Sequence, residues 1–150
     1  MYSRSRRKAI RLALLAAAFA LAAPLPCGAG EPAQLAIAGY DPVAYFTERK
    51  PTRGSPEIEY EWDEHRYRFS RIEHRQMFQA DPVRYAPQFA NFCAMALGRG
   101  EAIEADPENW LISNGKLYLF GLPKGPDLFG RDLTENIDRA NRNRPLIRKQ

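Results

Sequence analysis

The fold of this chain is indicated first by residues 110–120, WLISNGKLYLF. Two short apolar runs flank Asn114-Gly115, the dipeptide most typical of a two-residue type I′ turn, because both of its residues tolerate positive φ. The sequence therefore predicts a β-hairpin with strands at 110–113 and 116–120.

A second hairpin is predicted earlier in the chain. Residues 58–62, IEYEW, alternate apolar with acidic side chains, which is the period of a strand with one buried face. The alternation resumes at Tyr67 and Phe69, after a polar turn at residues 63–65.

A capped helix is predicted directly after this second hairpin. Ser70 and Glu73 have the spacing of a capping box, in which the two side chains satisfy free amides at the start of a helix. The helix is expected to extend to about residue 80. Its expected apolar members are Ile72, Met77 and Phe78.

An amphipathic helix is predicted near the C-terminus. Leu133, Ile137 and Ala140 recur at helical spacing from about residue 132, and Pro145 ends the pattern. Residues 121–130, which are rich in proline and glycine, are expected to form a loop. These elements predict a small α+β domain with two β-hairpins, a central capped helix and a C-terminal amphipathic helix.

An Asp-Pro dipeptide occurs three times with an aromatic residue four positions after the aspartate, beginning at Asp41, Asp81 and Asp106. The aspartate side chain can accept hydrogen bonds from free amides of a first helical turn, and proline fits the first helical position. Three short helical turns that carry buried aromatic side chains are therefore predicted.

The first 30 residues have the pattern of a cleavable signal peptide. A basic segment precedes the apolar residues 12–23, which are too few to span a membrane, and Pro24 and Pro26 follow. Cleavage is expected after Ala29 or Gly30, which leaves one domain at 31–150 with its core at about 37–142. The predicted location is periplasmic or secreted, by the general secretory or the twin-arginine route, without a permanent membrane anchor.

Removal of this leader changes the charge of the protein. Residues 31–150 keep 17 basic and 18 acidic residues, a formal charge of −1, so no broad basic surface for nucleic acid is predicted. The basic residues of the C-terminus are interpreted as a solvated helix end. They are Arg139, Arg142, Arg144, Arg148 and Lys149.

Several segments together resemble the YHS domain family, in its exported single-domain branch. The resemblance covers nearly the whole predicted mature chain and is carried by the succession Tyr-x-Phe-Ser to Phe-x-x-Asp-Pro-x-x-Tyr. The matching segments are 39–46 (GYDPVAYF), 67–70 (YRFS), 78–88 (FQADPVRYAPQ), 92–94 (FCA) and 116–119 (KLYL).

This resemblance implies a binding domain and raises the possibility of a soft metal. Related small domains in metal-handling proteins, some of them attached to copper-transporting pumps, carry paired cysteines. Here the strand ends at Phe69-Ser70 without a cysteine, and Cys93 follows Ala90-Asn91-Phe92 in place of Gly-Gly-Tyr.

Cys93 is the single cysteine of the predicted mature chain and the centre of the candidate site. Thiolate, imidazole and thioether groups suit Cu(I), so Cys93, His74, His65 and Met95 are candidate ligands for copper. Met77 is a further soft side chain, although both methionines are expected mainly to fill the core. A closed zinc site would need more ligands than this set provides.

Three alternatives for Cys93 stay open at this stage. The thiol is a metal ligand, a buried structural residue in a module that binds a small ligand or a protein partner, or a reactive group paired with His74 or His65. His65 is expected in a solvated turn and His74 near the surface. No phosphate loop, nucleophile elbow or paired-histidine motif is present, so binding is favoured over catalysis.

Overall fold

The computed structural model of this protein describes residues 32–148, and the predicted signal peptide lies outside them. It confirms a small α+β domain with two sheets. The described helices include none that is long and apolar enough to span a membrane.

The strands are β1 (Gln34–Leu35), β2 (Ser55–Trp62), β3 (His65–Phe69), β4 (Asp106–Ser113) and β5 (Lys116–Phe120). The α-helices are α1 (Ala44–Thr47), α2 (Ile72–Ala80), α3 (Pro82–Tyr85), α4 (Ala94–Gly98), α5 (Gly125–Arg131) and α6 (Leu133–Arg142). The 3-10 turns are η1 (Ala36–Gly39) and η2 (Arg144–Leu146).

The first sheet has the strand order β1-β3-β2 and contains the earlier predicted hairpin. β2 and β3 pair antiparallel around a two-residue turn, Asp63-Glu64, in which both residues have positive φ (48° and 65°). β1 adds a short parallel pairing to the other edge of β3. Tyr67 and Phe69 of β3 are buried, as their alternation predicted.

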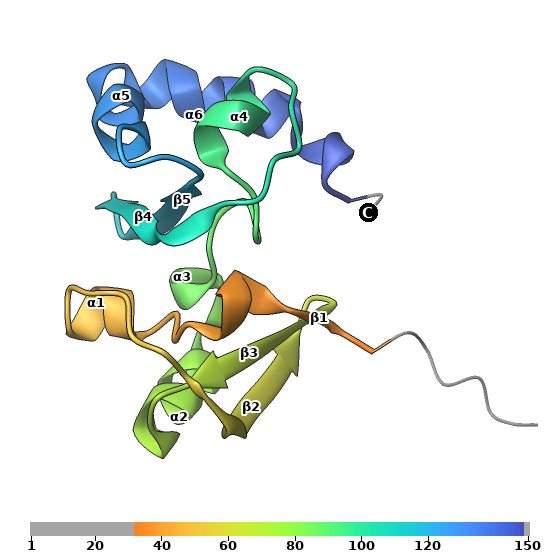
Figure 1. Cartoon of the computed structure of the whole chain (residues 1–150), viewed down its shortest axis with the longest axis vertical. Coiled ribbons are helices and arrows are strands. Elements are labelled where there is room, and N and C mark those ends of the chain that lie inside the picture. Colours follow the sequence, from red (N-terminus) through yellow and green to blue (C-terminus); the bar gives the residue numbers. More distant parts are fainter. Residues whose placement is uncertain (1–31, 149–150) are drawn as a thin grey trace, which may run out of the picture. The chain divides into compact units, whose positions relative to one another are not determined.

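The β4–β5 hairpin confirms the prediction from residues 110–120. Asn114 and Gly115 form its turn with φ of 50° and 69°, the positive values that a type I′ turn needs. β5 divides its side chains between two hydrophobic clusters, with Leu117 and Leu119 in the first and Tyr118 and Phe120 in the second. Because neighbouring residues of a strand face opposite sides, this one strand connects both cores. Figure 1 shows the hairpin between α4–α6 and the part of the domain that holds β1–β3.

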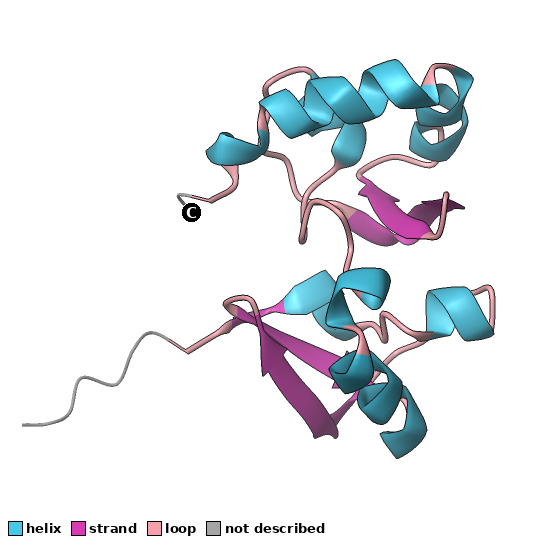
Figure 2. Cartoon of the chain, turned by 180° about the vertical axis from the view of Figure 1, so that it is seen from behind, coloured by secondary structure: helices cyan, strands magenta, loops and turns pink. Residues whose placement is uncertain are grey.

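The second cluster lies between β5 and the helices α4, α5 and α6, which gather on one side of the hairpin (Figure 2). α6 confirms the predicted C-terminal helix, with Ala140 buried and Leu133 and Ile137 packed on the cluster. The loop predicted at 121–130 is wrong in its second half, where α5 begins at Gly125. Phe129 of α5 is fully buried against Phe120, so tertiary packing outweighs the proline and glycine content of this segment.

Two of the three Asp-Pro motifs confirm the predicted helical turns. Asp41 accepts hydrogen bonds from the amides of Val43 and Ala44 before α1, and Asp81 caps α3 through the amide of Arg84. The prediction is wrong at Asp106, which begins β4. Its carboxylate still accepts from the amide of Glu108, but pairing with β5 holds the following residues extended.

α2 begins after the first hairpin and ends at Ala80 as predicted, but its predicted cap is wrong and Phe78 alone of its three predicted apolar members is buried. Arg71 precedes the helix without a side-chain cap, because Ser70 donates its hydroxyl to Asp41. The residues that α2 buries are His74 and Phe78, whereas Ile72 and Met77 are 52% and 37% exposed. Met77 is therefore not a core residue.

Candidate functional site

A cavity of about 460 Å³ opens beside the β2–β3 turn and includes His65. Its walls come from three segments far apart in the sequence: the turn itself, residues 83–90, and the C-terminal turn after α6. This volume falls within the range typical of small-molecule sites in proteins. The lining residues are Trp62, Asp63, Glu64, His65, Tyr67, Val83, Ala86, Pro87, Gln88, Ala90, Arg144, Ile147 and Arg148.

His65 is held at the edge of this cavity by its own turn. Its Nδ1 lies 2.7 Å from the carbonyl oxygen of Asp63, and because a carbonyl only accepts, Nδ1 must carry a proton. The described residues offer Nε2 no hydrogen bond. This nitrogen is therefore the one available to a ligand.

Arg144 is the partly buried cation of the cavity. Its guanidinium lies 4.9 Å from the centre of the Phe89 ring and donates to Asn141 Oδ1 at 3.1 Å. Burial lowers the pKa of Arg144, and the nearby charge of Arg148 lowers it further. Asp63 and Tyr118 act in the opposite direction, but the net effect is a lowered pKa of Arg144.

The rest of the lining is mixed in character. Asp63, Glu64 and Arg148 are exposed, whereas Ala86 and Pro87 are buried and form an apolar wall. Ala90 has a positive φ of 50°, like the two turn residues opposite, so the lining includes strained backbone. Such an arrangement combines a charged anchor, a titratable nitrogen and apolar surface.

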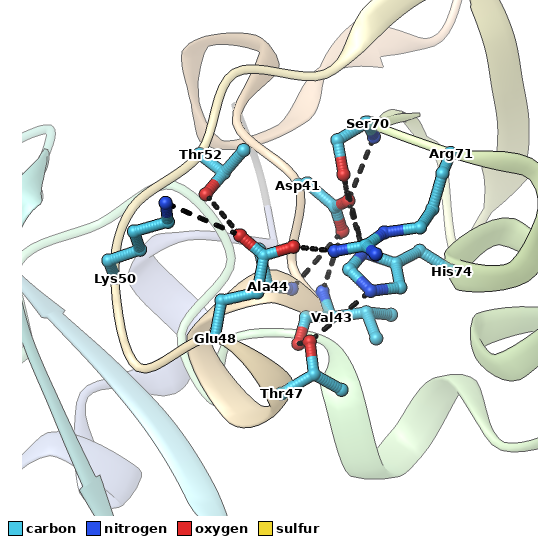
Figure 3. Close-up of polar contacts among 10 residues, drawn as sticks. All are labelled: Asp41, Val43, Ala44, Thr47, Glu48, Lys50, Thr52, Ser70, Arg71 and His74. Atoms are coloured by element: carbon cyan, nitrogen blue, oxygen red, sulfur yellow. Dashed lines mark hydrogen bonds and ion pairs between the residues drawn. The ribbon is translucent and has the colours of Figure 1, made fainter.

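A second polar site surrounds the buried side chain of Asp41 (Figure 3). Oδ1 accepts from Val43 and Ala44, and Oδ2 accepts from the amide and hydroxyl of Ser70 at 2.8 and 2.7 Å. His74 Nδ1 lies 2.6 Å from the same Oδ2. Asp41 is completely buried and His74 is 3% exposed, which corrects the expectation of a surface histidine. Asp41 was predicted only as a helix cap, and nothing local in the sequence indicated its contact with His74.

The other ring nitrogen of His74 faces α1. Nε2 lies 3.2 Å from Thr47 Oγ1, and that hydroxyl also lies 3.1 Å from the carbonyl oxygen of Val43. Asp41, His74 and Thr47 thus form a chain of polar contacts, the Asp41 relay, but the Thr47 hydroxyl donates to the Val43 carbonyl and not to His74 as a hydrolase nucleophile would. None of the three lines the 460 Å³ cavity. The contacts that the structure does provide join α1 to the start of α2, which is a structural role.

Cys93 is buried, with 7% exposure, and lies directly before α4. Its sulfur accepts from the amide of Ala96 at 3.4 Å, so the thiol caps a helix within the second hydrophobic cluster. Met95 packs against the same cluster. Of the three alternatives left open for Cys93, a structural residue agrees with this buried position.

The structure places the four candidate metal ligands in different surroundings. Cys93 and Met95 share a cluster, His74 bonds Asp41, and His65 lines the cavity. Neither imidazole forms a hydrogen bond with Cys93 in the described part of the chain. Within residues 32–148, no three histidine, cysteine or acidic side chains converge as metal ligands.

Comparison with protein-family models, with curated proteins and with solved structures found no match to this chain. What the protein does must therefore be inferred from its own residues. The residue that sequence reasoning missed is Arg144, which was interpreted as part of a solvated helix end. Pro145 is its one local signal, since a proline there ends the helix and directs the chain away from the helix axis.

Proposed function

We propose that this chain is an exported, YHS-type binding domain that takes a small ligand in the cavity beside His65. The observation that carries the proposal is the cavity of about 460 Å³, which three distant segments build around one partly buried cation. In this proposal Cys93 is a structural residue, because its sulfur already caps α4.

Binding is a better account of this cavity than catalysis. A nucleophile and a base within hydrogen-bond reach of each other would be needed for covalent chemistry. The described lining has no cysteine, serine or threonine, and its acidic and tyrosine side chains form no hydrogen bond with the His65 imidazole. The residues of the Asp41 relay lie outside the cavity. The lining instead supplies groups that orient a ligand.

The proposal is tested by NMR titration of the domain with three small probes of similar shape: benzoate, benzyl alcohol and benzylamine. Val83 lines the cavity and is 59% exposed, so Val83→Trp should obstruct the site without disturbing the core. Ile72→Trp, on an exposed position outside the lining, is the matched control.

Binding of at least one probe should shift amide signals of residues 62–65, 86–90 and 144–148. Val83→Trp should weaken that binding at least tenfold, and Ile72→Trp should leave it unchanged. If none of the three probes shifts these amides in the folded domain, the proposal is wrong.

A soft metal at Cys93 is the second candidate function. It is favoured by the presence of a thiol and the Met95 thioether on one hydrophobic cluster, two ligand types that suit Cu(I). Stoichiometric Cu(I) uptake, measured by competition with a chelator, should be lost in Cys93→Ser and weakened in Met95→Leu. Uptake that survives Cys93→Ser, or none in the unaltered protein, would exclude this site.

Export rests on residues 1–30 and is proposed from their sequence. Arg6→Lys combined with Arg7→Lys distinguishes the two routes, because a twin-arginine signal needs both arginines. Cell fractionation should recover a shortened protein outside the cytoplasm. Blocked export of the double variant identifies the twin-arginine route, and unchanged export identifies the general secretory route.

A further inference from the structure

We propose that the ligand of the cavity beside His65 is a small organic anion, a carboxylate or phosphate with an apolar body, whose charge is bound by Arg144. This inference rests on the proposed function and names the chemical class of its ligand. It follows from the charges, contacts and burial of the lining residues.

Arg144 is the side chain in the lining with the strongest requirement for a counter-charge. It makes no ion pair with any described carboxylate, although it is partly buried. Burial disfavours an isolated charge unless an opposite charge is close. The neighbouring cation Arg148 increases this requirement, because its repulsion also acts on Arg144.

The guanidinium of Arg144 is also held in place. Its central carbon lies over the Phe89 ring, 4.9 Å from the ring centre, and Asn141 accepts one of its five N–H groups. The described residues accept none of the remaining N–H groups. A planar, prepositioned fork of donors is the group that proteins use for two-point binding of carboxylate or phosphate.

The two acidic residues of the lining do not cancel the preference of Arg144 for an anionic ligand. Asp63 attracts Arg144, but it is exposed and forms no contact short enough to be an ion pair. Glu64 is exposed in the same turn. Solvated charges interact about fourfold more weakly than charges near a protein surface with reduced water, so neither carboxylate replaces a direct partner for the guanidinium of Arg144.

The remaining walls indicate an apolar body for the anion. Trp62, Pro87 and Ile147 line the cavity together with the buried Ala86. His65 Nε2 is available beside them, because Nδ1 is used by Asp63. A ligand with one anionic group and a flat apolar part would satisfy both kinds of wall.

The test compares probes that differ in charge and in body: benzoate, phenyl phosphate, inorganic phosphate, benzyl alcohol and benzylamine. Affinities are measured from the amide shifts of residues 62–65, 86–90 and 144–148. Arg144→Gln removes the proposed charge partner, and Arg142→Gln is the matched control, because Arg142 is exposed at the end of α6 outside the lining.

Benzoate or phenyl phosphate should bind at least tenfold more tightly than benzyl alcohol and benzylamine. Arg144→Gln should reduce that affinity at least tenfold, and Arg142→Gln should change it less than twofold. Inorganic phosphate should bind more weakly than phenyl phosphate if the apolar body contributes. The better of the two organic anions identifies the anionic group that the site prefers.

Failure of this inference differs from failure of the proposed function. If benzyl alcohol or benzylamine binds at these residues more tightly than the anions, the cavity takes a neutral or cationic ligand and this inference is wrong. If anion binding is unaffected by Arg144→Gln, Arg144 is not the charge partner. If no probe of any charge binds, the proposed function itself fails.

Discussion

His74 Nδ1 lies 2.6 Å from Asp41 Oδ2, and the two side chains are 33 residues apart in the sequence. Asp41 precedes α1 and His74 belongs to the first turns of α2, so this contact joins two parts of the fold. The carboxylate accepts five hydrogen bonds in total, four of them from Val43, Ala44 and Ser70. Asp41 is therefore the polar centre of the first core.

The first prediction concerns the two helix-capping aspartates. Asp41→Ala should lower the free energy of unfolding by about 3 kcal/mol or more, because it leaves buried donors without an acceptor. Asp81→Ala is the matched control, since Asp81 caps α3 within the same Asp-Pro-Val-x-Tyr pattern but is exposed. It should cost about 1 kcal/mol. Urea denaturation measures both, and equal losses would contradict the central role of Asp41.

The second prediction concerns the turn of the first hairpin. Glu64 has a φ of 65°, a region in which a residue with a side chain is strained. Glu64→Gly creates an Asp-Gly type I′ turn and should raise the free energy of unfolding by about 1 kcal/mol. Glu61→Gly, within β2, should lower it by a similar amount. A loss of stability in Glu64→Gly, measured by thermal denaturation, would show that the strain is relieved in another way.

The third prediction tests α5, a helix that the sequence did not predict. A Cβ added at Gly125 would lie 2.5 Å from Phe120 Cβ, whereas one at Gly130 would meet nothing within 4 Å. Gly125→Ala should therefore lower the free energy of unfolding by about 1–3 kcal/mol through overpacking. Gly130→Ala should raise it by about 0.5 kcal/mol, since alanine favours the helix. Equal effects of the two variants on chemical denaturation would be inconsistent with α5 as described.

The fourth prediction concerns alkaline pH. Burial raises the pKa of Tyr45 and of Tyr67 above the ordinary value of 10.0. The folded state holds these protons more tightly than the unfolded state, so the stabilisation is complete below pH 10 and is lost progressively as the pH rises above it.

Tyr67→Phe isolates one of these groups. Above pH 10, each such tyrosine should contribute a fall of about 1.4 kcal/mol per pH unit to the free energy of unfolding, and this variant should lack one contribution. Near pH 8 these tyrosines are protonated in both the folded and the unfolded state. The difference in free energy of unfolding between variant and parent should therefore not change with pH there. Parallel stability curves from pH 8 to 12 would refute this assignment.

The elements that the sequence predicted are those with strong local patterns. A type I′ turn requires positive φ at two positions, and Asn114-Gly115 adopts these values. Between two apolar runs, this dipeptide is the strongest local signal of a tight hairpin. The alternation of residues 58–62 and the spacing of Leu133, Ile137 and Ala140 are likewise properties of one segment. Such an element can be predicted from its own segment, because the repeat of the helix or strand sets the spacing of its buried side chains.

The wrong predictions have one common cause, which is competition from residues distant in the sequence. Ser70 has the spacing of a helix cap, but Asp41 offers it a stronger, charged acceptor. Residues 125–131 have the composition of a loop, but burial of Phe129 stabilises a helix. Asp106 has the pattern of a helical turn, but β5 supplies a strand partner.

The candidate site was predicted less well than the fold. His65 was identified as a candidate ligand, and the burial of Cys93 was among the readings left open. Arg144 was not identified as a site residue, because its position in the site depends on Phe89 and on a cavity built from three segments. His74 was expected near the surface, and its buried contact depends on Asp41, which is distant in the sequence.

The sequence alone determined the two hairpins, the C-terminal helix and the inventory of reactive side chains, because each depends on neighbouring residues and their backbone preferences. Only the tertiary structure decided which of those side chains meet. It directed His74 to Asp41, Cys93 to the cap of α4 and Arg144 to the cavity beside His65. These contacts join segments distant in the sequence, which meet only when the two hydrophobic clusters pack on either side of β5.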